Sequence, residues 1–176
     1  MGAGILPVAL YRGTLFLLLG KERNDLWSDF GGSSVNKEDI FKTAIREGCE
    51  ELNGFFGNED ELELMVKNNK IMKLYFEERQ TNKNKKTIYT TFLFNTKYDK
   101  NLPIYFNNVN KFAEKHLSDK VNKNHNGLFE KNEINWFSTT DLRESKIILR
   151  PWYKPFIDSV IKNEKIIIAS IKENNN

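Results

Sequence analysis

The residues of this chain that are best suited to chemistry are acidic and lie close together. Glu47, Glu50 and Glu51 are spaced at i, i+3 and i+4, so a helix would project their carboxylates from one side. Glu38 adds a fourth carboxylate a little earlier, soon after the glycine pair at 31–32. Hard divalent cations such as Mg²⁺ take several oxygen ligands, and a glycine turn can add a backbone carbonyl. The spacing therefore indicates a divalent-metal site.

A solvated acidic helix face is the alternative interpretation of these glutamates. Charged faces are common on surface helices, although like charges within one turn repel by roughly a few tenths of a kcal/mol per pair. Glu38 and the glycine pair favour the metal site, because they bring a fourth carboxylate and an accessible carbonyl to the start of the same helix.

The helix that carries these residues is predicted to run from about Asn36 to Leu52. Asn36 is a favourable N-cap, and Asp39 follows it at the spacing of a capping box. Asn53-Gly54 tolerates the left-handed backbone that ends a helix. The apolar residues recur at helical spacing away from the glutamates, in a stripe of Phe41, Ala44, Ile45, Cys49 and Leu52.

Strand-like segments lie on both sides of this helix. Segments 5–10 and 14–19 are apolar runs joined by a tight turn at Gly13, and 27–30 is a short strand that enters the glycine pair. Segments 71–78 and 87–96 predict a hairpin with a basic tip, and 134–137 predicts another short strand. Pro151 is expected to begin a last helix that runs to about Ile171, with its inward side formed by Ile157, Val160, Ile161, Ile168 and Ile171. This order predicts an α/β or α+β layered domain.

Composition limits the class of protein. The 176 residues are the size of one domain, and a 39% hydrophobic share with 13 Phe supplies a core, which excludes a disordered or fibrous chain. The polar, Asn- and Lys-rich stretch 98–130 is interpreted as an insertion, with a short helix around 109–117. The net charge of +3 is too small to indicate nucleic-acid binding by itself.

The sequence also indicates the cellular compartment in which the protein is expected. No apolar run approaches the ~20 residues that span a bilayer, and no basic segment precedes the apolar N-terminus, so neither a membrane span nor a signal peptide is expected. The single cysteine, Cys49, excludes an intramolecular disulfide and suits a reducing compartment such as the cytoplasm.

The acidic segment resembles the Nudix box, G-x5-E-x7-R-E-U-x-E-E-x-G-U, in which U is a bulky aliphatic residue. The six fixed positions that fall in register are Gly32, Glu38, Arg46, Glu47, Glu50 and Glu51. As a motif the resemblance covers about 26–54. It implies one Nudix hydrolase domain over 1–176: an α/β/α sandwich with a mixed central sheet, the box helix and a C-terminal helix.

Three positions depart from the box. Gly48 replaces an aliphatic residue, which costs about 1 kcal/mol of helix propensity and removes a core contact. Asn53 replaces the box glycine, but it tolerates the left-handed conformation, so the helix stop is expected to survive. Gly54 replaces the last aliphatic residue, and Phe55 or Phe56 is expected to supply the missing apolar anchor.

Nudix enzymes hydrolyse a nucleoside diphosphate linked to another moiety and use Mg²⁺ or Mn²⁺. The metal ligands that the resemblance implies are the carbonyl of Gly31 and the carboxylates of Glu47, Glu50 and Glu51, with Glu38 as an outer or water-mediated ligand. Arg46 is implied to pair with a box carboxylate and hold it in one rotamer. The general base is either a box glutamate or a later one, for which Glu133 is preferred to Glu130; both also fit plain surface loop composition.

Substrate contacts are less specific in the sequence. Lys21 and Arg23 are candidates for phosphate contacts, and Trp27, Phe30 and Trp152 are candidates for stacking on a base. A solvated loop for the cations and a core for the aromatics remain open. Cys49 is expected in the core, and His116 and His125 lack the partners of a metal site.

The sequence thus predicts a divalent-metal-dependent pyrophosphohydrolase acting on a small nucleotide or nucleotide conjugate. One alternative is removal of the mRNA cap, with capped RNA lying along the basic tip (Arg79, Lys83, Lys85, Lys86) and the Lys-rich segment 111–131. Another is a diphosphoinositol phosphate substrate. A catalytically silent Nudix-fold binding module is a further alternative, disfavoured because every box glutamate is present. The oligomeric state stays open.

Overall fold

The computed structural model describes residues 1–79, 86–117 and 128–174, and for 76–79 and 86–87 only the backbone. The strands are β1 (Gly2–Tyr11), β2 (Thr14–Glu22), β3 (Trp27–Ser28), β4 (Phe30–Ser33), β5 (Lys70–Arg79), β6 (Lys86–Asn95) and β7 (Lys131–Ser138). The helices are α1 (Ile40–Glu51), α2 (Glu59–Asn68), α3 (Leu102–His116), α5 (Thr139–Arg143), α6 (Lys154–Lys162) and α7 (Glu164–Asn174). None of the helices among these residues is long and apolar enough to cross a bilayer.

One mixed seven-stranded sheet forms the centre of the molecule. Its main path is β3-β2-β1-β6-β5, while β4 pairs with β1 and β7 pairs with β2. Only the β1–β6 pairing is parallel among these neighbours. One edge of β1 is shared, because residues 8–11 pair with β2 and residues 2–5 pair with β4. This division places the glycine pair of β4 against the beginning of β1.

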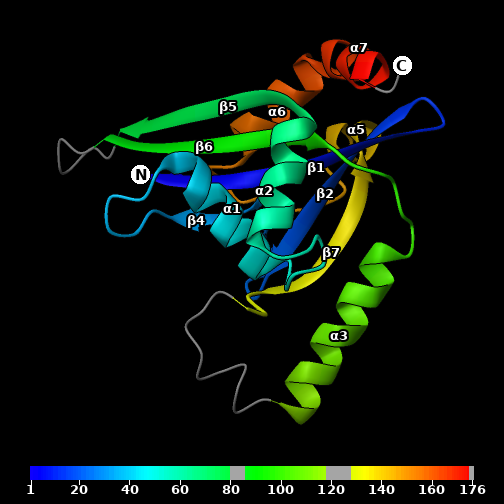
Figure 1. Cartoon of the computed structure of the whole chain (residues 1–176). Helices are drawn as coiled ribbons and strands as arrows, with labels where there is room; N and C mark the ends of the chain where they lie inside the picture. The colour runs from blue at the N-terminus through cyan, green and yellow to red at the C-terminus, as the bar shows by residue number, and fades with distance from the viewer. Residues whose placement is uncertain (80–85, 118–127, 175–176) are drawn as a thin grey trace.

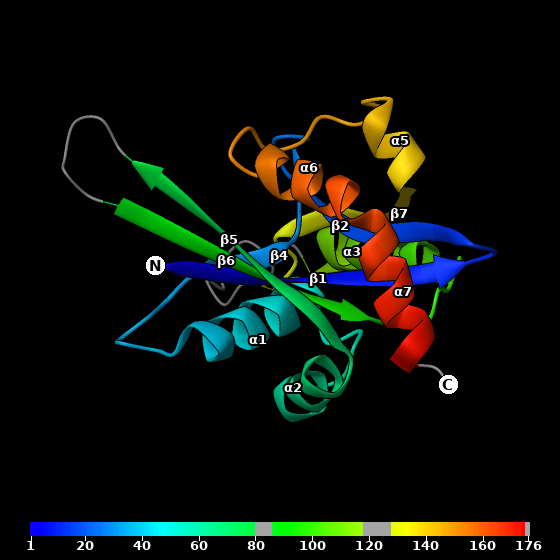
Figure 2. The same ribbon diagram turned by 90° about the horizontal axis from the view of Figure 1, so that it is seen from above.

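Helices cover both faces of the sheet, so the predicted α/β/α sandwich is confirmed. Figure 2 shows the sheet between α1 and α2 on one side and α5, α6 and α7 on the other. One core cluster joins the sheet to α1, α2 and α3, and includes Ile5, Ile45, Leu62 and Phe106. A second cluster, on the opposite face, includes residues of α6 and α7. Alternating strand residues supply both clusters.

The hairpin predicted near the N-terminus is confirmed. Tyr11 pairs with Thr14, and the two residues between them, Arg12 and Gly13, have φ angles of 50° and 81°. Two consecutive positive φ angles are the signature of a two-residue turn whose twist suits a hairpin. The strands predicted at 71–78, 87–96 and 134–137 are also present as β5, β6 and β7.

The box helix begins later than the sequence predicts. Asn36 and Lys37 have φ angles of 43° and 65°, which no helix accommodates, and Asp39 is the N-cap instead. The Asp39 carboxylate accepts hydrogen bonds from the backbone N–H groups of Phe41 and Lys42 at 2.8 and 3.4 Å. Segment 36–38 is therefore a turn that brings Glu38 back against α1.

Other helices differ from the prediction. Helix α2 was not predicted from the sequence, and α3 begins at Leu102 and not near 109. The single last helix expected from Pro151 is two helices, α6 and α7, because Asn163 caps the first through bonds to the carbonyls of Ser159 and Val160. The inward stripe nevertheless holds, since Ile157, Val160 and Ile171 are buried and Ile161 and Ile168 pack against them.

The departures from the box are accommodated by neighbouring apolar residues. A Cβ on Gly48 would lie 2.5 Å from Cδ1 of Ile5, so the β1 side chain fills the space of the missing aliphatic group. Phe55 packs against Phe106 and Phe56 against Phe94, at ring distances of 5.4 and 6.2 Å. Both therefore anchor the end of α1, as predicted.

We predict that Gly48→Leu, which restores the residue type of the box, destabilises the fold by about 1–3 kcal/mol through overpacking against Ile5. Urea denaturation measures this change. In the double variant Gly48→Leu/Ile5→Ala, most of the loss should be recovered relative to Ile5→Ala alone. Additive losses in the double variant would contradict the contact.

Candidate functional site

The glycine pair brings strand and helix into close contact. Gly31 and Gly32 of β4 lie opposite Gly4 and Ala3 of β1. A Cβ on Gly31 would be 2.3 Å from Cα of Gly4, and one on Gly32 would be 2.5 Å from the carboxylate of Glu47. Glycine at 31 therefore allows β4 to approach β1 closely, and glycine at 32 leaves room for the carboxylate of Glu47. Figure 1 shows α1 and β4 side by side.

Arg46 is the centre of the acidic cluster. Its guanidinium group contacts Glu38 at 3.1 Å, Glu47 at 2.9 Å and Glu50 at 3.3 Å, and Nη2 donates to the carbonyl of Ser33 at 3.1 Å. The hydrogen bond from Arg46 holds the pKa of Glu38 below its usual value, and in turn the carboxylates raise the pKa of Arg46. The arginine thus pairs with box carboxylates, as expected, but with three at once.

Glu51 points to the other side and is buried. Only 5% of Glu51 is exposed. Its Oε2 accepts a hydrogen bond from the N–H of Gly31 at 2.7 Å, and its Oε1 lies 3.4 Å from Nζ of Lys131. Burial raises the pKa of Glu51 to about 8, although Lys131 and the N–H of Gly31 act in the opposite direction. Glu51 therefore ties the end of α1 to the glycine pair.

Lys131 is a member of the site that the sequence did not identify. It is 1% exposed, and its ammonium group contacts Glu22, Ser28 and Glu51. A lysine in a strand is normally solvated, and nothing in the local sequence distinguishes this one. Its environment arises from the pairing of β7 with β2, which joins residues more than a hundred positions apart.

The donor atoms at this site suit a hard divalent cation. Four carboxylates and the carbonyl of Gly31 are the oxygen donors that Mg²⁺ and Mn²⁺ accept. Burial raises the pKa values of Glu47 and Glu50, with Arg46 opposing it. Among the described residues, no three acidic, histidine or cysteine side chains stand close enough to share one ion. The guanidinium group of Arg46 lies among Glu38, Glu47 and Glu50, whereas Glu51 contacts Lys131 on the other side.

An asparagine network fixes the segment before β7 beside the box. Asn53 donates from Nδ2 to Oδ1 of Asn110 at 2.8 Å, and Asn110 donates to the carbonyl of Lys131 at 2.6 Å. The N–H of Phe129 donates to Oδ1 of Asn53 at 2.8 Å. Asn53, a departure from the box, thus has a structural role that glycine could not have.

This network brings Glu130 to the acidic cluster. Its negative charge contributes to the raised pKa values of Glu47, Glu50 and Glu51. Glu133, preferred on the sequence, instead forms an ion pair with Lys21 at 2.7 Å, a contact that raises the pKa of Lys21. The second choice from the sequence is therefore the loop glutamate that the structure places next to the box.

The other substrate-contact candidates are dispersed. Trp27 is 7% exposed and packs edge-on against Phe137, and Phe30 is fully buried, so both belong to the core and offer no face for stacking on a base. Trp152 is partly buried and lies beneath the guanidinium group of Arg150. Arg23 is exposed in the turn after β2.

The single cysteine lies in the core, as the sequence predicts. Cys49 packs against the core, and burial raises the pKa of its thiol, which opposes a nucleophilic role. His116 lies against the ring of Phe112. His125, Lys83 and Lys85 lie outside the described residues, and Arg79 and Lys86 are described by their backbone only.

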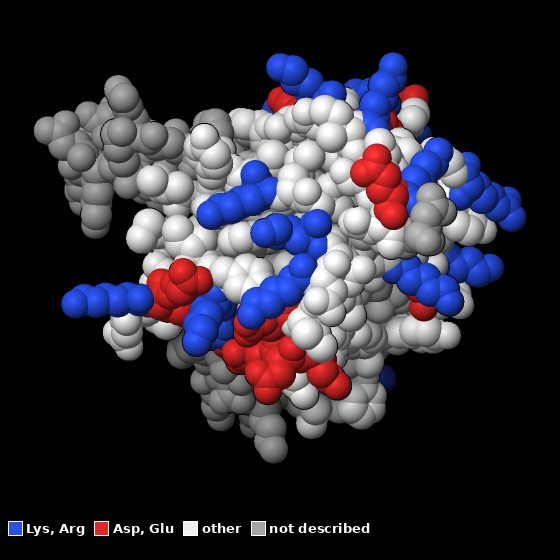
Figure 3. All heavy atoms as spheres, turned by 45° about the horizontal axis from the view of Figure 1, so that its top comes forward, with Lys and Arg blue, Asp and Glu red and all other residues white. Residues whose placement is uncertain are grey.

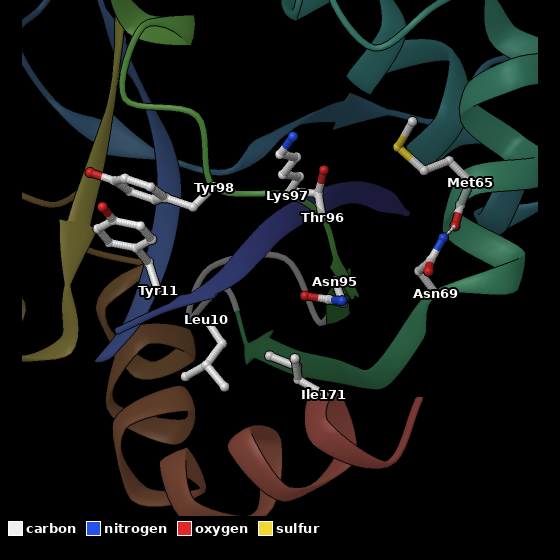
Figure 4. Close-up of a pocket in the computed structure, with 9 residues that line it drawn as sticks. All are labelled: Leu10, Tyr11, Met65, Asn69, Asn95, Thr96, Lys97, Tyr98 and Ile171. Atoms are coloured by element: carbon white, nitrogen blue, oxygen red, sulfur yellow. Dashed lines mark hydrogen bonds between the residues drawn. The ribbon is translucent and has the colours of Figure 1, made fainter. Parts of the chain in front are cut away.

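Two surface hollows differ in their relation to the box. A hollow of about 450 Å³ touches Glu50 directly and is lined also by Cys49, Asn53 and Leu128. A cleft of about 570 Å³ lies at the opposite end of β1, between Tyr98, Asn95, Asn69 and Ile171 (Figure 4). Of these two, the smaller hollow is the one that is lined by a residue of the acidic cluster.

Comparison with known proteins gives similarity in structure and not in sequence. No family model matches the chain, and no curated protein matches its sequence. The Nudix hydrolase RenU of M. smegmatis matches with a TM-score of 0.58 and 13% identity, over 93% of this chain and 85% of that one. The Ap4A hydrolase of C. elegans matches with a TM-score of 0.56 and 15% identity, over 93% and 96%.

A third solved structure is a bifunctional NMN adenylyltransferase/ADP ribose pyrophosphatase of Francisella tularensis, in complex with AMP and a manganese ion. It matches with a TM-score of 0.57 and 16% identity, over 92% of this chain and 41% of that one. This chain therefore has the fold of the Nudix hydrolases, and it carries six of the seven fixed residues of the Nudix box pattern on α1 and on the segment that leads into it.

Proposed function

We propose that this chain is a divalent-metal-dependent pyrophosphohydrolase that acts on a nucleoside diphosphate linked to another moiety. The observation that supports it most is the acidic cluster itself: Glu47 and Glu51 lie against the glycine pair, and all four box glutamates are held by Arg46 or Lys131. A cluster of this kind on a Nudix fold is more than a solvated face, because three of its members share the guanidinium group of Arg46 and the fourth is buried beside Lys131.

The names of the similar structures agree with this class of substrate. One is an Ap4A hydrolase, and another is an ADP ribose pyrophosphatase with AMP and manganese bound. Both names describe substrates in which a nucleoside is joined through a phosphoanhydride. At 15–16% identity they support the class of reaction for this chain but not a particular substrate.

The electrostatics require a cation. A pyrophosphate is strongly anionic, so Glu47, Glu50 and Glu51 would repel it. A bound Mg²⁺ or Mn²⁺ would neutralise the phosphates, act as a Lewis acid and lower the pKa of a bound water. We assign its binding to Glu47, Glu50 and the carbonyl of Gly31, with Glu38 in an outer position. Glu51, which the resemblance implies as a ligand, is held instead by Lys131 and the N–H of Gly31.

The chain's own residues then have distinct tasks. Arg46 holds the carboxylates of Glu47 and Glu50 close together against their mutual repulsion. Its contact with Glu38 fixes the position of the guanidinium group. Glu130 is the loop carboxylate that we assign as general base, because it is exposed and close to the cluster. The hollow beside Glu50 is the candidate site for the nucleoside.

The alternative substrates have weaker support. Capped RNA and diphosphoinositol phosphates were expected to use the basic tip and the segment 111–131, which lie partly outside the described residues. On the face shown in Figure 3, basic side chains are interspersed with acidic ones, as on an ordinary solvated surface. We favour a nucleotide conjugate, because the similar solved structures include an Ap4A hydrolase and an ADP ribose pyrophosphatase.

We expect Glu50→Gln to lower kcat by about 10²-fold or more, because it removes a proposed metal ligand while keeping the size of the side chain. Phosphate release with Mn²⁺ or Mg²⁺ from dinucleoside polyphosphates, ADP-ribose, nucleoside triphosphates and capped RNA gives the measurement and the substrate class. Glu63→Gln is the matched control on α2, where Glu63 pairs with Lys67. Turnover within a few-fold of wild type in Glu50→Gln would sink the assignment.

The two loop glutamates can be separated by the same assay. Glu130→Gln should lower kcat by about 10²-fold or more with little change in KM, as expected for a general base. Glu133→Gln removes only the partner of Lys21 and should change kcat by less than about threefold. The reverse order of effects would move the base to Glu133.

A further inference from the structure

Three oxygen atoms surround the ammonium group of Lys131. Nζ lies 3.0 Å from Oγ of Ser28, 3.3 Å from Oε1 of Glu22 and 3.4 Å from Oε1 of Glu51. An ammonium group has three N–H donors, and three oxygens surround it here. Lys131, Ser28 and Glu51 are each at most 5% exposed.

The fold is shaped to admit this side chain. A Cβ on Gly20 would lie 2.9 Å from Cδ of Lys131, so glycine in β2 leaves room for the aliphatic stem. The network continues to Arg150, whose Nη2 lies 2.9 Å from Oε2 of Glu22. Glu22 thus lies between two cations, Lys131 and Arg150, which offset the cost of removing charged groups from water.

From this geometry we propose that Lys131 is a fixed internal cation of the acidic cluster. It holds Glu51 against the N–H of Gly31, and its ammonium group fills the oxygen-lined space between Glu51 and Glu22. A divalent ion is thereby excluded from that space. The lysine limits the number of metal ions that the cluster takes and confines them to the side of Glu47 and Glu50.

This proposal rests on the proposed function in one respect, namely that the box binds divalent ions. It adds that the site's metal number is set by a residue outside the box. Removing the ammonium group leaves the carboxyl groups of Glu22 and Glu51 next to the hydroxyl of Ser28, with Arg150 as the cation that remains beside them. These are hard oxygen donors, which Mn²⁺ accepts. A neutral side chain at 131 should therefore open a further cation position.

The test is a Mn²⁺ titration of the purified, metal-free protein, with free Mn²⁺ followed by electron paramagnetic resonance. Lys131→Met, which keeps most of the stem, is expected to bind one Mn²⁺ per chain more than wild type. Lys131→Gln is a second neutral variant in case the first does not fold, which circular dichroism and thermal unfolding will show. Lys131→Arg keeps the charge and should bind the wild-type number.

The double variant Glu22→Gln/Lys131→Met is the matched control, because it removes the second carboxylate and should return the number of bound ions to that of wild type. A merely structural role for Lys131 would change stability in these variants without adding a bound ion. Equal numbers of bound Mn²⁺ in wild type and in a folded neutral variant overturn the proposal. Wild-type phosphate release, assayed separately, tests the proposed function, so the two failures are distinguishable.

Discussion

The site depends on one constraint: the negative charges of neighbouring glutamates must be compensated by cations of the protein itself. Glu38, Glu47, Glu50 and Glu51 come from one helix and the turn before it, and at that spacing they repel each other unless cations stand between them. Arg46 supplies one cation for three of them, and Lys131 supplies another for the fourth. These two cations allow the four carboxylates to stay close together at one position, although their mutual repulsion would otherwise drive the side chains out into solvent.

The sheet is what makes this compensation possible. The division of β1 between β2 and β4 places the glycine pair beside α1, and the absence of side chains there lets Glu47 and Glu51 reach the strand. The pairing of β7 with β2 carries Lys131 to the opposite side of the same cluster. Two cations from distant parts of the chain therefore meet one acidic helix, and the asparagine network keeps Glu130 beside them.

Local sequence patterns were sufficient to predict most of the secondary structure around the site. The turn at Gly13, the strands and the apolar stripe of α1 depend on neighbouring residues and were found from the sequence. The N-cap was misplaced because both Asn36 and Asp39 can cap a helix, and the choice depends on the pairing of Glu38 with Arg46. The break at Asn163 was missed because an asparagine in an apolar helix gives only a weak local signal.

The roles of Lys131 and Glu130 lay beyond local patterns for a different reason. Their environment is created by strand pairing and by contacts of α3, which bring residues together across long stretches of chain. Trp27 remained a stacking candidate in the sequence because its burial against Phe137 depends on the same strand pairing, which the sequence does not show. Box residues could be found from spacing, whereas the partners that hold them required the fold.

The most direct measurement of the central claim is anomalous X-ray diffraction from crystals of the wild-type protein soaked in Mn²⁺. The account predicts a strong manganese peak bounded by carboxylate oxygens of Glu47 and Glu50 and the carbonyl of Gly31, with the guanidinium group of Arg46 displaced from at least one of these glutamates. Crystals in which Arg46 keeps all its partners and manganese binds only elsewhere would contradict it.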